Sequence, residues 1–251
     1  MTENTNTQKA HFEALHARYE AHYYDKWSMK YRNEFIYGPL WGDLDLNGLR
    51  IAELACGSGH NTLSILAKAP QAQVVGFDIS AAACQDYAAN TGMPAYEADI
   101  TLPWQGETGF DVVFIVGGLH HCVRDLRQAL ENVGRILKPG GLFLMQEPNA
   151  CFFLESARQL WYRKDGLFDA GNEAALDMDE LARIGEPWFK PQRVKYSGGP
   201  AYFVVLQSMI LRVPLGVKNL ISAPLIVLER LWDRLPGKHF HNTFIARWER
   251  L

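Results

Sequence analysis

The stretch LACGSGHNT, residues 54–62, decides the fold because two glycines stand one residue apart where an apolar run ends. The run before it, residues 49–55, predicts a buried strand, and residues 62–69 predict a helix that stops at Pro70. Glycine adopts backbone conformations closed to other residues and lets a ligand approach the main chain closely. This order of strand, turn and helix indicates a nucleotide-like ligand at the turn, with a plain tight turn as the alternative.

The composition indicates a globular protein with one large domain, or one domain and a small appendage. The chain has 251 residues, of which 48% are apolar and 21% charged, and its formal net charge of −3 provides no basic field for nucleic acid. Its four cysteines form no CxxC pair, which disfavours a zinc ribbon or a redox dithiol. Residues 1–10 lack the basic and apolar blocks of a signal peptide, so we expect a cytoplasmic protein.

Segments typical of strands and helices alternate along the chain, which predicts an α/β fold with a Rossmann-like, doubly wound and mostly parallel sheet. We expect seven strands, at residues 49–55, 73–77, 95–98, 110–116, 142–146, 192–196 and 240–248. Helices are expected at residues 8–37, 62–69, 81–90, 124–137 and 177–184, the first of them ending at Gly38-Pro39. We divide the chain into an N-terminal helical cap, 1–43, and a domain, 44–251, in which 199–238 form an apolar helical insertion before the last strand, a lid or substrate-binding segment.

Asp78 stands 19 residues after Gly59, at the end of the second expected strand. An acidic side chain at this place accepts hydrogen bonds from the two hydroxyls of a ribose, whereas the alternative is a helix N-cap, for which Ser80 is equally suited. The dinucleotide fingerprint needs a third small residue where this chain has Thr62, which counts against NAD. No GKS or GKT follows the glycines, so the motif is not a phosphate-binding P-loop.

Five motifs in order resemble the class I S-adenosylmethionine-dependent methyltransferases, in particular the branch that acts on small molecules. They are ELACGSG, GFD at Asp78, Ala98-Asp99-Ile100, LHHC, and LKPGG followed by a strand and Glu147-Pro148. The resemblance covers residues 49–147. It implies S-adenosyl-L-methionine as the cofactor and methyl transfer as the reaction.

The resemblance also implies which residues contact the cofactor. Glu53, Ala55, Gly57 and Gly59 would surround its methionine part, and Val116 would pass close to the sulfonium. Asp78 would hold the ribose with Ile79 beside the adenine, and Asp99 would accept from the adenine amino group with Ile100 next to it. Arg32 would pair with the carboxylate of the cofactor, and a solvated surface charge is its alternative.

His120 and His121 directly follow the fourth expected strand, on the cofactor side of the sheet. If the acceptor is a hydroxyl, it must lose a proton, and a histidine is the natural base at neutral pH. We favour His121 as the base and His120 second, although either side chain could only pack or cap the next helix. A metal site from His120, His121 and Glu147 is the weaker alternative, because no ligand spacing demands it, and we expect no metal.

Residues 201–235 are more apolar than a solvated loop, so they could belong to the core, roof a substrate pocket, or contact a membrane surface or a second subunit. Tyr23, Tyr24 and Trp27 would supply aromatic surface to the same pocket. The stretch 116–120 lacks the (Asp/Asn)-Pro-Pro-aromatic motif of nucleic-acid amino methylases in this family. This departure, with the acidic net charge, argues against DNA or RNA base amines as substrates. The candidate histidine base and the apolar and aromatic segments lead us to expect O-methylation of a lipophilic or aromatic small molecule. N- or C-methylation, an NAD(P)-dependent oxidoreductase and a non-catalytic cofactor-binding scaffold are the alternatives.

Overall fold

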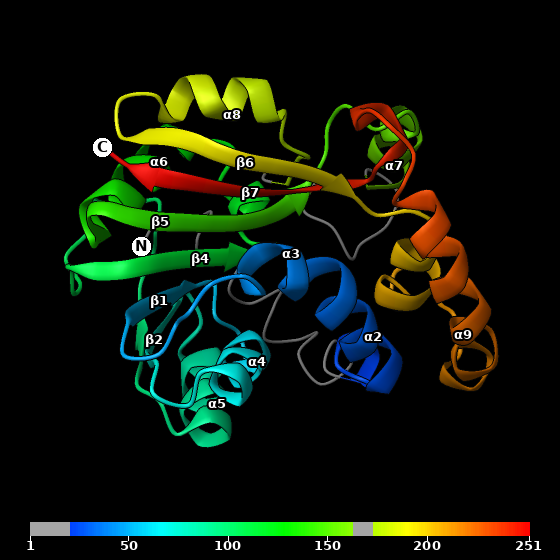
Figure 1. Ribbon diagram of the computed structural model, residues 1–251, viewed down its shortest axis with the longest axis horizontal. Coiled ribbons are helices and arrows are strands. Elements are labelled where there is room, and N and C mark those ends of the chain that lie inside the picture. Colours follow the sequence, from blue (N-terminus) through cyan, green and yellow to red (C-terminus); the bar gives the residue numbers. More distant parts are fainter. Residues whose placement is uncertain (1–20, 163–172) are drawn as a thin grey trace.

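The computed structural model describes residues 21–162 and 173–251 of the chain. Its centre is one seven-stranded sheet with the strand order β3-β2-β1-β4-β5-β7-β6 (Figure 1). The strands are β1 (Arg50–Leu54), β2 (Gln73–Asp78), β3 (Ala95–Glu97), β4 (Phe110–Val116), β5 (Leu137–Pro148), β6 (Phe189–Ser197) and β7 (Thr243–Arg250). Neighbouring strands from β3 to β5 pair in parallel, and β7 runs antiparallel to both β5 and β6. The predicted mostly parallel, seven-stranded fold is confirmed.

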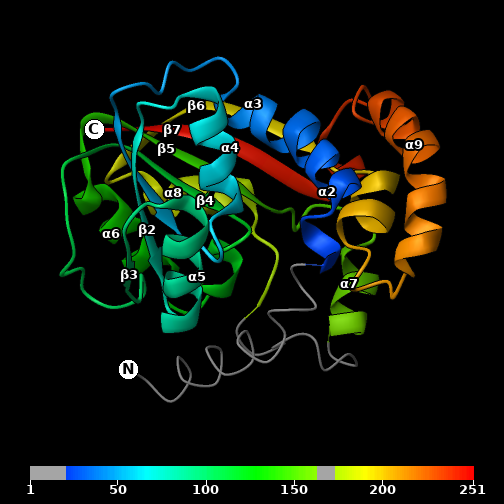
Figure 2. The same ribbon diagram turned by 90° about the horizontal axis from the view of Figure 1, so that it is seen from below.

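Helices cover both faces of the sheet, and apolar residues of the same strands serve both layers (Figure 2). In β1, Ile51 packs into one core cluster and Ala52 into the other, as expected for strands whose side chains alternate between two buried faces. The longer helices are α2 (Lys26–Tyr31), α4 (His60–Lys68), α5 (Ala81–Thr91), α6 (Leu126–Ile136), α7 (Glu155–Tyr162), α8 (Met178–Gly185) and α9 (Leu215–Trp232). Short helical segments are η1 (Arg32–Tyr37), α3 (Gly38–Trp41), η2 (Leu119–His121), η3 (Tyr202–Leu206) and η4 (Lys238–Phe240).

The cap helix does not end at Gly38-Pro39, so this prediction is wrong. The chain passes from α2 through the π-helical turn η1 into α3, which continues to Trp41. Pro39 lies in the first turn of α3, where the absence of its N–H breaks no hydrogen bond of that helix. The predicted helix over residues 8–20 lies outside the described residues.

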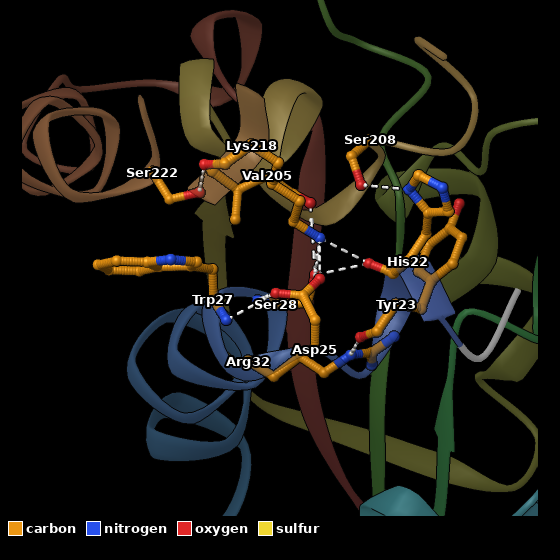
Figure 3. A network of polar contacts seen from close by, with 10 residues as sticks. All are labelled: His22, Tyr23, Asp25, Trp27, Ser28, Arg32, Val205, Ser208, Lys218 and Ser222. Atoms are coloured by element: carbon orange, nitrogen blue, oxygen red, sulfur yellow. Dashed lines mark hydrogen bonds and ion pairs between the residues drawn. The ribbon is translucent and has the colours of Figure 1, made fainter. Parts of the chain in front are cut away.

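Buried polar contacts join the cap to the insertion between β6 and β7 (Figure 3). Lys218 of α9 leaves 1% of its side chain exposed, and its Nζ forms an ion pair with the Asp25 carboxylate. The same Nζ donates to the Ser28 hydroxyl over 2.7 Å and to the His22 carbonyl over 2.7 Å. We call this set of four residues the cap clasp. It holds α9 against α2, beyond the carboxyl ends of the parallel strands (Figures 1 and 2).

Candidate functional site

The loop between β1 and α4 turns sharply on residues with left-handed backbone. The φ angle is 51° at Ala55, 51° at Gly57 and 86° at Gly59. A Cβ added at Gly57 would meet nothing within 4 Å, so the main chain there is open to a ligand. A Cβ added at Gly59 would lie 2.4 Å from Thr91 Cγ2, so this glycine is needed for the packing of α5. The two glycines therefore have different roles: one exposes the backbone, and the other brings a helix close.

Asp78 lies at the carboxyl end of β2 and connects two loops. One carboxylate oxygen accepts from the Gly57 N–H and the other from the Ser80 N–H, each over 2.9 Å. Ser80 is the N-cap of α5, because its hydroxyl accepts from the Ala83 N–H. A carboxylate accepts up to about four hydrogen bonds, so these contacts are compatible with a ribose held by Asp78.

The other residues expected to contact the cofactor, Val116 at the sulfonium and the rest at the adenine, lie around the ends of β2, β3 and β4. Asp99 accepts from the Thr101 N–H over 2.9 Å and from its hydroxyl over 2.6 Å, which fixes the carboxylate at the turn after β3. Ile79, Ile100 and Val116 are all half-buried. The carboxyl ends of parallel strands form the ligand-binding edge of such a sheet, so this placement is compatible with an adenosine crevice.

Glu53 in β1 is fully buried and organises the start of α4. Its two carboxylate oxygens accept from Asn61 Nδ2 over 2.8 Å and from the Thr62 hydroxyl over 2.5 Å. Tyr37 of the cap donates to Asn61 Oδ1 over 2.6 Å. Desolvation by burial raises the pKa of Glu53 to about 8, although the two side-chain hydrogen bonds oppose it. Glu53 thus ties the glycine loop to α4 and the cap, and its contact with the cofactor stays a prediction.

Arg32 is buried, with only 5% of its surface exposed, so the alternative of a solvated surface charge is wrong. Its Nε donates to the Tyr23 carbonyl over 3.3 Å, and its guanidinium lies 4.8 Å from the centre of the Tyr24 ring. Tyr24 in turn stacks on His60, with ring centres 3.7 Å apart. Because His60 follows the glycine loop directly, Tyr24 and Arg32 lie at the side of the crevice where the methionine part is expected.

The other two aromatic residues predicted to contact the acceptor point in different directions (Figure 3). Tyr23 is buried, and its hydroxyl donates to Oε1 of Gln207, a residue of the insertion. Trp27 lies on the opposite side of the cap clasp in Figure 3. The ammonium groups of Lys26 and Lys30 lie 5.1 and 5.3 Å from its ring centre. The structure therefore places Tyr24 beside the start of α4, Tyr23 against the insertion, and Trp27 on the other side of the cap clasp from Tyr23.

The two histidines after β4 each lie next to a carboxylate. His120 Nδ1 lies 2.8 Å from Glu147 Oε2, and His121 Nδ1 lies 3.3 Å from Glu173 Oε1. Glu147 is fully buried and also accepts from the backbone N–H groups of residues 118–120. Desolvation raises the pKa of Glu147 to about 7, and burial followed by the neighbouring His121 lowers the pKa of His120 well below its usual value. The site thus has two carboxylate–imidazole pairs side by side.

The histidine turn touches the glycine loop. Gly118, which starts this turn, is buried, and a Cβ added to it would lie 2.7 Å from Ala55 Cβ. A side chain at Gly118 would collide with Ala55, so the histidine turn and the glycine loop pack against each other at the same edge of the sheet. This contact places the candidate base beside the candidate cofactor loop.

Sequence reasoning missed Glu173 and misjudged Glu147. Nothing in the spacing links Glu173 to His121, because the two residues meet only through the tertiary fold. A hydrogen bond of 3.2 Å from the Ala174 N–H to the His120 carbonyl holds Glu173 beside the histidine turn. Glu147 appeared only in a motif and as a metal ligand, whereas the structure uses its oxygens to hold the histidine turn.

Three exposed side chains of α9 give the insertion an apolar outer face: Leu220, exposed to 80%, Leu231 to 55% and Val227 to 54%. A homodimer or membrane-surface contact through residues 201–235 stays a prediction. Within residues 21–162 and 173–251, no helix has both the length and the apolar character needed to cross a bilayer.

Comparison with known families gives a match over residues 52–143 to a methyltransferase domain. A probable phthiotriol/phenolphthiotriol dimycocerosates methyltransferase 2 of Mycobacterium ulcerans is 32% identical over 111 residues, which are 43% of this chain and 42% of that protein. Trans-aconitate 2-methyltransferase of Rhodopseudomonas palustris is 33% identical over 103 residues, 40% of this chain and 39% of that protein. The chain therefore matches less than half the length of these relatives.

Solved structures show the same fold over nearly the whole chain. The N-methyltransferase NodS of Bradyrhizobium japonicum, in complex with S-adenosyl-L-homocysteine, has a TM-score of 0.57 at 12% identity. The likeness covers 94% of this chain and 97% of that one, and at this identity it speaks for the fold alone. Together these findings show a methyltransferase domain over residues 52–143, within a fold shared with a solved N-methyltransferase, and they support S-adenosyl-L-methionine as the cofactor.

Proposed function

We propose that the chain transfers the methyl group of S-adenosyl-L-methionine to a hydroxyl oxygen of a lipophilic or aromatic small molecule. The observation that carries the proposal is the contact of the histidine turn with the glycine loop at Ala55. This contact supports the proposal that a histidine accepts the proton close to the bound methyl donor. Two relatives named as methyltransferases of small molecules, trans-aconitate and the phthiotriol dimycocerosates, support a small-molecule acceptor.

The bound cofactor supplies a methyl group that is already activated by the sulfonium, so the protein mainly has to position the acceptor. The Nδ1 side of His121 faces Glu173, which leaves its Nε2 as the proposed acceptor of the hydroxyl proton. As that proton moves to Nε2, the oxygen–carbon bond forms and the carbon–sulfur bond breaks, with its electron pair on sulfur. His120, whose pKa is lowered by burial, is the second candidate and would act in its neutral form.

The acceptor pocket is proposed between the cap and the insertion. Tyr23 joins the two through Gln207, and Tyr24 stacks on His60 at the start of α4. Their rings would give one wall of the pocket an aromatic surface. Trp27 remains a proposed contact only for a long acceptor, because it lies on the opposite side of the cap clasp from Tyr23. Residues 199–238 would then form the roof, and residues 1–43 the side.

Cofactor binding is tested by calorimetry with S-adenosyl-L-homocysteine, S-adenosyl-L-methionine and NAD. We expect micromolar binding of the first two, a loss of about 10- to 100-fold in Asp78→Asn, and no change in Asp45→Asn, an exposed acid of a distant loop. Binding of NAD alone would support the oxidoreductase. In that case Thr62, which is fully buried and bonded to Glu53, would have to be reconciled with a pyrophosphate turn.

Methyl transfer is tested by screening lipophilic phenols, alcohols and acids for S-adenosyl-L-homocysteine formation, with the product identified by mass spectrometry. We expect an O-methyl product, and a His121→Gln variant that loses turnover while it keeps its affinity for the cofactor. An N- or C-methyl product would overturn the assignment of the oxygen. Cofactor binding without turnover on any acceptor would support a non-catalytic scaffold.

A further inference from the structure

The residues around the histidine turn include one group with the composition of a metal site. One ligand atom from each of His120, His121 and Glu173 lies within 4.8 Å of the others. We propose that these three side chains bind one divalent first-row transition metal ion, such as Zn²⁺ or Mn²⁺. Two imidazoles and one carboxylate are a common protein ligand set for these ions.

The distances between the side chains fit one shared ion. Metal–ligand bonds of about 2.1 Å set neighbouring donor atoms about 3.0–3.4 Å apart. The distance from His121 Nδ1 to Glu173 Oε1 is 3.3 Å, and the two imidazole rings have their centres 4.0 Å apart. Small movements of the side chains would bring all three ligand atoms to one point.

The three side chains are partly shielded and still reachable from solvent. The side chains of His120 and His121 are exposed to 16% and 19%, and that of Glu173 to 6%. An ion can therefore enter from the crevice, and the shielding strengthens its interaction with the carboxylate.

His120 has the surroundings of a metal ligand rather than of a surface imidazole. Its Nδ1 faces the Glu147 carboxylate, so its Nε2 is the nitrogen that would bind the ion. A carboxylate behind an imidazole fixes the ring and its tautomer in many metal sites. Glu147 supports the site from behind, and Glu173 takes the ligand position.

This inference rests on the proposed function, because it concerns how the same site activates the acceptor. Three protein ligands leave coordination positions for an oxygen of the acceptor. The charge of the ion would lower the pKa of that hydroxyl, whose proton would leave to solvent. With the ion bound, His121 would hold the ion instead of accepting the proton. The bonds made and broken at the methyl group are the same as in the metal-free reaction.

The test is calorimetric titration of the chelator-treated full chain with Zn²⁺ alone and with Mn²⁺ alone, without cofactor or acceptor. We expect one ion per chain with micromolar affinity. Glu173→Gln keeps the side-chain shape, and it should weaken binding at least tenfold, as should His121→Ala. His239→Ala, which removes an exposed histidine outside the cluster, should leave binding unchanged.

Absence of stoichiometric binding overturns the metal site, as does binding by Glu173→Gln and His121→Ala that is as tight as binding by the wild type. The same preparations are then assayed for methyl transfer. Full turnover by the chelator-treated protein would support the proposed function and reject a role for the metal in it. Ion binding without methyl transfer would support the metal site and reject the proposed function.

Discussion

Replacement of Glu53 by glutamine should change how the stability of the protein depends on pH. The pKa of Glu53 is raised to about 8 in the folded protein, mainly by burial, whereas its ordinary value is 4.5. Between these two values the unfolded chain releases a proton that the folded chain keeps. The free energy of unfolding therefore falls as the pH rises from 4.5 to about 8, because the folded state has bound more protons.

The size of this loss follows from the two pKa values. Each pH unit within the window costs about 1.4 kcal/mol of unfolding free energy, so the full window costs about 5 kcal/mol. Between pH 5.5 and pH 7.5 the loss from this group alone is about 3 kcal/mol. Glutamine does not titrate, and its amide can still bond to Asn61 and Thr62. The Glu53→Gln variant should lack this part of the pH dependence.

The assay is urea unfolding of the wild type, Glu53→Gln and a control variant, Glu107→Gln, measured at several pH values between 5 and 8.5. Glu107→Gln, at an exposed ion pair with Arg50, is the matched control and should follow the wild type. Other groups, Glu147 among them, titrate in both proteins and cancel in the comparison. Parallel pH profiles of wild type and Glu53→Gln would refute a Glu53 pKa near 8.

Three further expectations concern the loops and the cap. Asp78→Asn should lower the affinity for S-adenosyl-L-homocysteine at least tenfold by calorimetry, and its urea midpoint should fall less than that of Asp78→Ala, because the amide oxygen can still accept one of the two backbone hydrogen bonds. Gly59→Ala should lower the free energy of unfolding by about 3 kcal/mol, because the added Cβ is both in a left-handed conformation and too close to Thr91. Gly57→Ala should lower it by only about 1 kcal/mol, because its Cβ has open space and only the backbone strain remains. Equal losses in urea unfolding would contradict this difference. Lys218→Met should lose about 2–4 kcal/mol because it leaves the Asp25 carboxylate without its cation, and a second change of Asp25→Asn should restore part of the loss.

The sheet was predictable from the sequence because its central strands are apolar on both faces. The range 110–116 expected for the fourth strand is the range that β4 occupies. The sequence pattern misplaced element boundaries where a proline or glycine lies inside a helix or strand instead of ending it. Pro39 is the first example, since a proline within a helical stretch normally marks its end. A second is β5, which begins at Leu137 because the LKPGG segment joins the strand through an irregular pairing. The helix α7 was not foreseen.

The candidate site was predictable where it depends on strand ends and not where it depends on distant contacts. Asp78 and the histidines follow strands directly, so the parallel order brings them to one edge. Glu173 and Lys218 reach their partners through the folding of long connections, and Lys218 lies 193 residues from Asp25 along the chain. No local period or spacing carries such information. Arg32 is likewise buried because the cap packs around it, and the sequence alone did not distinguish this from a solvated position.

The cap clasp has a consequence for attempts to redesign this enzyme. Since Lys218 of the insertion is buried and pairs with the partly exposed Asp25 of the cap, neither segment is an interchangeable module. In a chimera with a foreign insertion, the Asp25 carboxylate would face a surface that lacks the ammonium group of Lys218. Exchange of acceptor specificity between related proteins should therefore transplant the amino-terminal helices and the late insertion as a matched set.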